Sequence, residues 1–167
     1  RGIARELSEI HGVDPDRAEL AAAGHDVARH ISPEILLKSA LDNGIPVTPI
    51  EHRFPVLLHG PVGSVWLERE GSITDEEILP SITWHTTGHP ELSPIGQIVF
   101  LADKLDPKKD KSYPFQASVR KASFINLDVG MVAFLNGVLL QHLGRGDMIH
   151  PTSITTRNHY LASLIEN

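Results

Sequence analysis

Apolar residues recur along the chain at the spacing of amphipathic helices, and turn-forming residues divide this pattern into segments. Three segments begin with a helix-capping residue followed by a proline, which suits the first helical turn: Asp14-Pro15, Ser32-Pro33 and Ser93-Pro94. The pattern predicts helices at residues 2–10, 14–29, 32–44, 59–70, 74–85, 93–103, 126–143 and 151–165. The alternation of apolar and polar residues that marks strands is nearly absent, so we expect an all-α fold.

Local sequence signals also predict the structure or the burial of several further segments. Residues 45–58 contain three prolines, and we expect a loop there. Thr74 and Glu77 have the spacing of a capping box, which places the start of a helix at Thr74. Residues 106–113 are rich in lysine and are expected to be solvated, whereas the apolar face of residues 129–140 is expected to be core.

The composition indicates one globular domain that spans residues 1–167. Of the 167 residues, 41% are hydrophobic and 22% are charged, which is enough apolar material for a sizeable core. The chain has no cysteine, which excludes a disulfide scaffold, a thiolate zinc site, an iron–sulfur cluster and a cysteine nucleophile. A chain without cysteine is typical of the cytoplasm, and we expect a cytoplasmic location.

The net charge and the hydropathy of the chain limit the classes of partner that we expect it to bind. The net charge is −6, whereas a protein that binds a nucleic-acid duplex usually carries an excess of basic residues. No apolar run in the sequence approaches the ~20 residues of a membrane helix, and no signal peptide opens the chain. We therefore expect neither a nucleic acid nor a membrane as the main partner.

Histidine is unusually frequent, with 10 residues in the chain, and several histidines lie where predicted helices begin or end. His25 and Asp26 follow a run of small residues late in a helix, His59 lies at a helix start, and His85 lies at a helix end. Asp103 lies late in an otherwise apolar helix, where a buried carboxylate needs a partner or a metal. Imidazole and carboxylate together suit iron, manganese and similar divalent metals. Successive antiparallel helices would aim these side chains at one pocket.

Two adjacent residues such as His25 and Asp26 cannot face the same point from the interior of a regular helix. Both can reach one metal from a helix end or an irregular turn. The alternative is that Asp26 and Asp103 are helix caps or surface residues, and that the histidines are core residues with satisfied hydrogen bonds. A single histidine would favour this alternative, and the presence of several at helix boundaries weakens it.

The ordered pattern His-Asp, His, His, Asp resembles the HD phosphohydrolase superfamily. Within it, the chain is similar to the symmetrical bis(5'-nucleosyl)-tetraphosphatases over nearly its whole length. The motifs that carry this resemblance are Leu57-Leu58-His59-Gly60-Pro61-Val62-Gly63, Trp84-His85-Thr86-Thr87-Gly88, Phe100-Leu101-Ala102-Asp103, Ile149-His150-Pro151 and Arg157-Asn158. The resemblance implies an HD-domain helical bundle of about seven helices.

The resemblance also implies a metal site. A divalent metal, iron in the first place with manganese or cobalt as alternatives, would be held by His25, Asp26 and Asp103. The family uses one more histidine from its first helix, and this position falls a few residues before Arg1. We therefore expect residues 1–167 to form a single HD domain without the start of its first helix.

The implied substrate is diadenosine tetraphosphate, which is cut at its centre to give two molecules of ADP. Asp26, His59 and His85 are the expected catalytic residues, and His59 and His85 would lie beside the phosphates or bind a second metal. Lys109 occupies a position where the family places a phosphate-contacting basic residue, and Arg29 is a further candidate. The late segment would approach the nucleotide through Gly146, Asp147, Ile149, His150 and Pro151.

Several alternatives remain open at this level. The same site would suit another nucleotide substrate, or a module that binds nucleotide or metal without turnover. Arg29 would equally suit a solvated helix end, and His150 would suit a loop-shaping role before the last helix. The apolar helix at residues 126–143 is compatible with a core element or with a homodimer interface.

Overall fold

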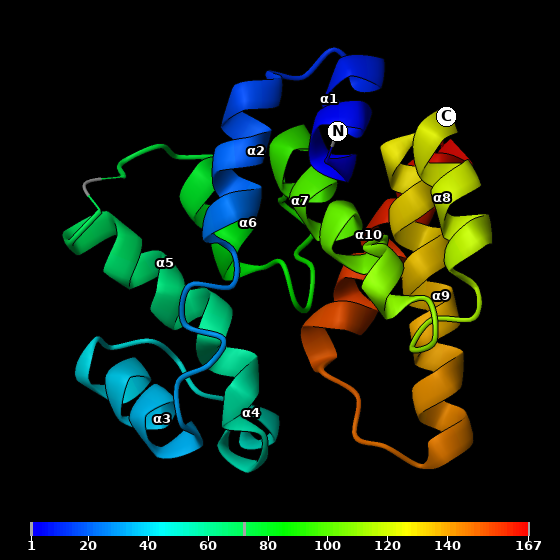
Figure 1. Ribbon diagram of the computed structural model, residues 1–167. Helices are drawn as coiled ribbons and strands as arrows, with labels where there is room; N and C mark the ends of the chain where they lie inside the picture. Colours follow the sequence, from blue (N-terminus) through cyan, green and yellow to red (C-terminus); the bar gives the residue numbers. More distant parts are fainter. Residues whose placement is uncertain (1, 72, 167) are drawn as a thin grey trace.

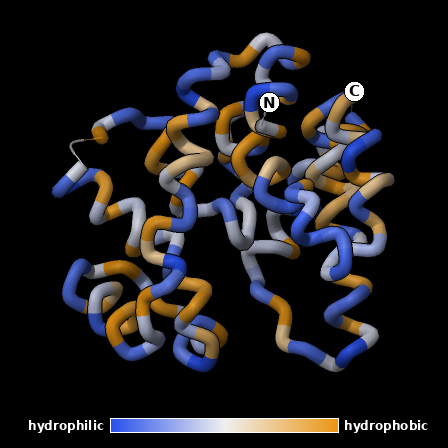
Figure 2. Tube along the Cα trace, in the orientation of Figure 1, coloured by the Kyte–Doolittle hydropathy of each residue, from blue (hydrophilic) through white to orange (hydrophobic). Residues whose placement is uncertain are grey.

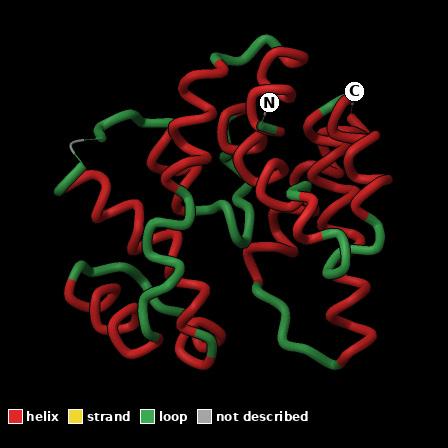
Figure 3. Tube along the Cα trace, in the orientation of Figure 1, coloured by secondary structure: helices red, strands yellow, loops and turns green. Residues whose placement is uncertain are grey.

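The computed structural model describes residues 2–71 and 73–166, and within these ranges it is built of helices joined by loops, without strands (Figures 1 and 3). The α-helices are α1 (Ile3–His11), α2 (Pro15–Gly24), α3 (Pro33–Asp42), α4 (Pro49–Arg53), α5 (His59–Arg69), α6 (Ile78–Thr83), α7 (Pro94–Lys104), α8 (Gln116–Ile125), α9 (Leu127–Arg145) and α10 (Pro151–Glu166). Two short 3₁₀ helices, η1 (Pro55–Leu58) and η2 (Pro107–Lys109), complete the set. The predicted all-α fold is confirmed, although the described part of the chain holds more helices than the expected seven.

The helix starts that rest on local capping are confirmed. The side chain of Asp14 accepts hydrogen bonds from the backbone N–H groups of Asp16 and Arg17 at the start of α2. Ser32 and Ser93 cap α3 and α7 in the same way. A proline follows each of these capping residues, because its missing N–H is not needed in the first turn.

The expectation of a loop throughout residues 45–58 is wrong. Pro49 begins α4 and Pro55 begins η1, so two of the prolines start helices instead of interrupting them. Thr48 and Glu51 form a complete capping box at α4, a signal that is present in the sequence. Helix α8 was likewise not predicted, and its first turn has no side-chain cap.

The predicted capping box of Thr74 and Glu77 is also wrong. The carboxylate of Asp75 accepts the backbone N–H groups of Glu77 and Ile78, and α6 begins at Ile78. Arg17 of α2 donates to both oxygens of the same carboxylate, at 2.7 Å to Oδ1 and 3.0 Å to Oδ2. This pairing with Arg17 lowers the pKa of Asp75 to about 2. Asp75 therefore caps the turn that leads into α6, whose first residue is Ile78, and ties this turn to α2.

Replacing Asp75 with alanine is expected to lower the free energy of unfolding by about 1 kcal/mol, the usual loss for a helix cap. Because the folded pKa lies below that of the unfolded chain, this stabilisation is complete above about pH 4 and is lost as the pH falls towards 2. Urea unfolding of wild type and D75A at pH 6, 4 and 3 measures the difference. The neighbouring exposed Glu76→Ala is the control, and a difference that does not shrink in acid would contradict the assignment.

The core consists of three apolar clusters, and α2 or the turn after it contributes a residue to each of them. Figure 2 shows how hydrophobic and hydrophilic residues are distributed along the trace of the chain. Ala18 belongs to the largest cluster, which lies between α1, α7, α8, α9 and α10. Ala21 packs with residues of α6 and α7, and Ala28 packs with residues of α3, η1 and α5. Small side chains at these positions let the helices approach closely. The residues that follow α2 therefore lie at the junction of all three clusters.

Helix α9 is only partly a core element. Met131, Phe134 and Leu135 are buried, whereas Leu140 is 70% exposed, so the expectation of core along the whole of 129–140 is wrong for its second half. The helix is long and apolar enough to cross a membrane by length and composition, contrary to the expectation from the sequence. One such helix is weak support for a membrane span, because its first half packs against α7 and α8 in the main cluster.

Candidate functional site

His25 and Asp26 lie in a turn that follows α2. The helix ends at Gly24, and not near Arg29 as predicted, and the next residues form turns closed by bonds such as Arg29 N–H to Asp26 C=O at 2.9 Å. In this turn the two neighbouring side chains face each other, with His25 Nε2 3.4 Å from Asp26 Oδ2. An irregular turn at the helix end is the arrangement that a shared ligand site requires.

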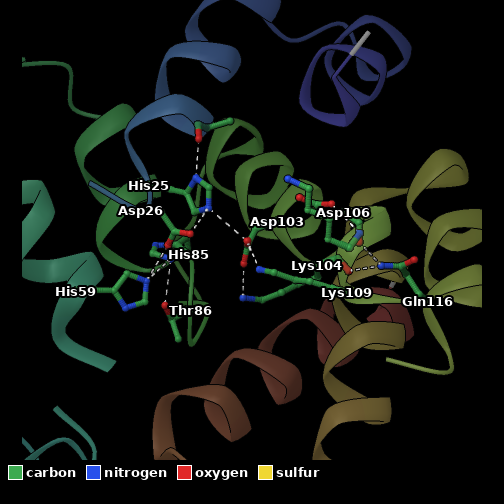
Figure 4. A network of polar contacts seen from close by, with 12 residues as sticks. His25, Asp26, His59, His85, Thr86, Asp103, Lys104, Asp106, Lys109 and Gln116 are labelled. Carbon is green, nitrogen blue, oxygen red and sulfur yellow. Dashed lines mark hydrogen bonds and ion pairs between the residues drawn. The ribbon is translucent and has the colours of Figure 1, made fainter. Parts of the chain in front are cut away.

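Two more histidines reach the same point from other elements (Figure 4). His59 is the first residue of α5, and His85 follows the end of α6; their side chains are 5% and 2% exposed. Their Nε2 atoms lie 2.9 Å apart. The ring of His85 also stands edge-on to that of His25, with centroids 4.9 Å apart. The three predicted histidines therefore form one group.

Each of these three rings is held through Nδ1 by a backbone carbonyl three residues earlier in the chain. The Nδ1 atoms of His25, His59 and His85 lie 2.5, 2.5 and 2.8 Å from the oxygens of Ala22, Val56 and Ile82. A carbonyl oxygen only accepts, so Nδ1 carries the proton in each ring. The neutral form of each ring then presents a lone pair at Nε2, the atom that faces the shared centre.

Asp26 touches all three imidazoles. Its Oδ1 lies 3.1 Å from His59 Nε2 and 3.6 Å from His85 Nε2, while its Oδ2 faces His25. Hydrogen bonds with the three rings hold the pKa of the Asp26 carboxyl well below its usual range. The side chain is 44% exposed, more than those of the three histidines. Asp26 is thus an ionised carboxylate on the open side of the group.

Asp103, in the last turn of α7, completes the group. Its side chain is 8% exposed, and its Oδ1 lies 3.3 Å from His25 Nε2. Lys104 Nζ donates to Oδ2 at 2.8 Å, and Lys109 Nζ donates to Oδ1. Burial raises the pKa of the Asp103 carboxyl, but Lys104, His25 and Lys109 more than offset this and hold it well below its usual range. We call His25, Asp26, His59, His85 and Asp103 the histidine–aspartate cluster.

The environment changes the proton affinity of two histidines in opposite directions. Burial lowers the pKa of His25, but hydrogen bonds with Asp103 and Asp26 reverse this effect and raise the pKa to about 10. Burial lowers the pKa of His85 to about 4. The cluster therefore favours positive charge between the two carboxylates and a neutral imidazole at His85.

The donor set of the cluster fits a divalent metal. His25, His85 and Asp103 form one group of ligand atoms that lie within 4.8 Å of one another, and Asp26, His59 and His85 form a second. When both rings are neutral, the Nε2 lone pairs of His59 and His85 face each other at 2.9 Å and repel, and a cation between them and the carboxylates would remove this repulsion. The two oxygens of Asp26 face different histidines, Oδ2 towards His25 and Oδ1 towards His59. Imidazole and carboxylate suit iron, manganese or cobalt.

A cavity of about 640 Å³ lies next to the cluster, between α4, α9 and the loop before α10. We call it the apolar cavity, because aromatic and aliphatic side chains form much of its wall. The lining includes Phe54, Tyr113, Phe134, Leu139, Met148 and Thr86. Thr86 Oγ1 lies 3.2 Å from His85 Nε2, so the wall of the cavity contacts the cluster, although no member of the cluster lines this cavity.

Four of the five residues expected to approach the nucleotide line the apolar cavity: Gly146, Asp147, Ile149 and His150. Pro151 begins α10 and is not among the lining residues. The backbone N–H of Thr152 donates to His150 Nδ1 at 3.2 Å, so His150 also shapes the entry to α10. Its Nε2 is buried and faces Glu51 Oε1 at 3.5 Å, without a hydrogen-bond partner in the described part of the chain.

The basic residues around the cluster differ in their exposure and in the cavity that they line. Lys109 bonds to Asp103 and lines a second cavity, of about 760 Å³, formed with α1 and lined also by His25, Asp26 and Asp103 of the cluster. Lys108 is exposed, as expected for a solvated run, and so is Arg29, which lines neither cavity. Lys104 was missed in the sequence, although a lysine that directly follows Asp103 in an apolar helix is a visible signal.

Comparison with known proteins shows relatives over the whole fold. Residues 2–108 match the HD domain family. The chain is 30% identical over 156 residues to a symmetrical bis(5'-nucleosyl)-tetraphosphatase of Halalkalibacterium halodurans, covering 93% of this chain and 82% of that protein. The protein of the same name from Bacillus subtilis is 28% identical over 153 residues, covering 92% and 81%.

Among solved structures, the fold matches an HD superfamily hydrolase from Clostridium acetobutylicum that is described as involved in NAD metabolism. The TM-score is 0.90 at 25% identity, over 96% of this chain and 84% of that one. These matches confirm the resemblance seen in the sequence. The chain belongs to the HD domain family, within the group of the symmetrical bis(5'-nucleosyl)-tetraphosphatases.

Proposed function

We propose that this protein hydrolyses diadenosine tetraphosphate at its centre and releases two molecules of ADP. The observation that carries this proposal is the meeting of three imidazole Nε2 atoms and two carboxylates beside two cavities: His25, Asp26 and Asp103 line the second cavity, and Thr86 joins His85 to the wall of the apolar cavity. The relatives named symmetrical bis(5'-nucleosyl)-tetraphosphatase supply the substrate and the position of the cut. The apolar walls suit a nucleoside, and the cluster beside them suits phosphates.

In this proposal His25, Asp26 and Asp103 hold a divalent metal, with iron as the first candidate. When bound, such a metal supplies Lewis acidity, which lowers the pKa of a water molecule and polarises a phosphoryl oxygen. His59 and His85, together with Asp26, are the residues that would hold a second metal, and otherwise the two histidines would lie beside the substrate phosphates.

The residues of the chain then have separate tasks. Asp26 orients the attacking water, because it is the carboxylate of the cluster that is open to the solvent. If His59 is not a ligand, it would protonate the leaving ADP through Nε2, since its Nδ1 is already bonded to the Val56 carbonyl, whereas His85, which burial keeps neutral, would instead lie beside the phosphates. Lys109 adds positive charge beside Asp103 for the substrate phosphates, although lysine lacks the two-pronged geometry of arginine. The late segment would approach the nucleoside through Gly146, Asp147, Ile149, His150 and Pro151. A phosphate contact by Arg29 stays a prediction.

The net charge of −6 requires that the site itself be positive if it is to attract an anionic substrate. Lys104 and Lys109 provide this local charge, and a metal bound to His25 would add to it in place of the proton on Nε2. The acidic remainder of the surface does not oppose binding at short range, because salt screens charges beyond about 8–10 Å.

Hydrolysis of diadenosine tetraphosphate by the full chain, loaded in turn with Fe²⁺, Mn²⁺ and Co²⁺, tests the proposal. Ion-exchange chromatography is expected to show ADP as the product. Release of ATP with AMP would contradict a cut at the centre. Binding of ADP without any turnover would show a binding module, and turnover of a different nucleotide alone would move the same chemistry to another substrate.

A further inference from the structure

Lys104 is a buried cation at the wall between the histidine–aspartate cluster and the apolar cavity. The residue is 6% exposed and lines the cavity together with Thr86 and Tyr113. Its Nζ lies 5.1 Å from the centre of the Phe100 ring and 5.9 Å from that of the Phe134 ring. Figure 4 shows its ammonium group against the carboxylate of Asp103.

The hydrogen bonds of this ammonium are incomplete. A lysine ammonium has three N–H donors, and among the described residues Asp103 is its one hydrogen-bond partner. The aromatic rings attract the charge but accept no conventional hydrogen bond. A buried charge with unused donors is costly unless a further acceptor lies in the cavity.

The charge of the Asp103 carboxylate does not by itself explain why a second lysine, Lys104, is buried beside it. The carboxylate already has Lys109 on Oδ1, and His25 Nε2 lies 3.3 Å from the same oxygen. Lys109 lines the second cavity, whereas Lys104 lines the apolar cavity. The two lysines would therefore contact ligands in different cavities. A second cation on one carboxylate, facing a cavity with free donors, is the arrangement expected for binding an anion.

We propose that Lys104 binds a phosphate of the nucleoside diphosphate half that occupies the apolar cavity, while it keeps its bond to Asp103. The nucleoside would lie against Phe134 and Tyr113, and its phosphates would point past Lys104 and Thr86 towards the cluster. This inference rests on the proposed function for the identity of the nucleotide. It adds a phosphate-binding residue to that function.

Binding of ADP and of adenosine to wild type and Lys104→Met, measured by titration calorimetry, tests the inference. Methionine keeps the length and the contact with the aromatic rings but removes the charge. A lost charge-assisted hydrogen bond is expected to weaken ADP binding roughly 10- to 100-fold. Adenosine affinity and metal content, measured by elemental analysis, are expected to stay within about 2-fold. The exposed Lys108→Met is the matched control and is expected to bind ADP like wild type.

Three results would overturn the inference: unchanged ADP affinity in K104M, an equal loss for ADP and adenosine, or a fall in metal content that accounts for the loss. Wild type without measurable affinity for ADP would overturn it as well. Should K104M not fold, Lys104→Gln asks the same question, because its amide still donates to Asp103 without the charge. If wild type binds ADP through Lys104 but leaves diadenosine tetraphosphate intact, the proposed function fails and this inference stands.

Discussion

Replacing Asp26 with asparagine is expected to lower kcat for diadenosine tetraphosphate by on the order of 10³-fold. Asp26 contacts the Nε2 atoms of His25, His59 and His85. Asparagine has one carbonyl oxygen and no charge, so it cannot face two sets of histidines with anionic oxygens. Loss of even an outer hydrogen-bond partner of a metal ligand lowers affinity or activity ~10–100-fold, and the loss of a ligand is larger.

Initial rates of ADP release and the metal content of D26N, measured together, test this prediction. Asp42→Asn is the matched control, because Asp42 is an exposed carboxylate whose partner is Lys38 on the surface of α3. It is expected to retain the rate and metal content of wild type within about 2-fold. Near-normal turnover of the D26N variant would show that Asp26 is not a metal ligand.

Replacing Gly60 with alanine is expected to lower the free energy of unfolding by about 2–3 kcal/mol, as overpacking does in a tight contact. A Cβ at this position would lie 2.7 Å from the carbonyl oxygen of Thr83 and 2.9 Å from that of Ile82. Both are backbone atoms, so α5 and α6 have to separate. The Ile82 oxygen also holds His85 Nδ1, and activity is therefore expected to fall with stability.

Thermal unfolding of G60A is expected to show a Tm lower by roughly 5–10 °C. Gly144→Ala is the matched control in α9, because a Cβ there would meet no atom within 4 Å. That substitution is expected to leave the Tm unchanged or to raise it slightly, since alanine favours a helix over glycine. Equal melting temperatures of G60A and wild type would show that the close approach of α5 to α6 is not needed for the stability of the fold.

The histidine–aspartate cluster was predictable as a set of residues, because its members are unusual in type and lie at helix boundaries. His25 with Asp26, His59, His85 and Asp103 all meet at one point, as expected. The role of Asp26 between two groups of histidines was not predictable, because it depends on the angles between α2, α5 and α6. The position of Lys104 next to Asp103 is visible in the sequence, but its place at the cavity is not, since packing of α7 against α9 brings Phe134 and the cavity to it.

For the fold, helix starts were predictable where a local cap defines them, as at Asp14, Ser32 and Ser93. The end of α2 was placed too late, because the turn after Gly24 depends on burial of Ala28 against α3 and α5. Such contacts between distant segments leave no local signal. The start of α6 was placed four residues too early, at Thr74 instead of Ile78, since Arg17 of another helix pairs with Asp75 in the turn between them.

Main-chain oxygens, and not side chains, fix the orientation of the three imidazole rings. Any amino acid offers the same oxygen, so exchanges at Ala22, Val56 and Ile82 that fit the surrounding packing leave the protonation pattern of the rings intact. Evolutionary drift at these three positions is therefore compatible with unchanged chemistry. A homologue that differs at all of them is expected to bind its metal through the same ring nitrogens.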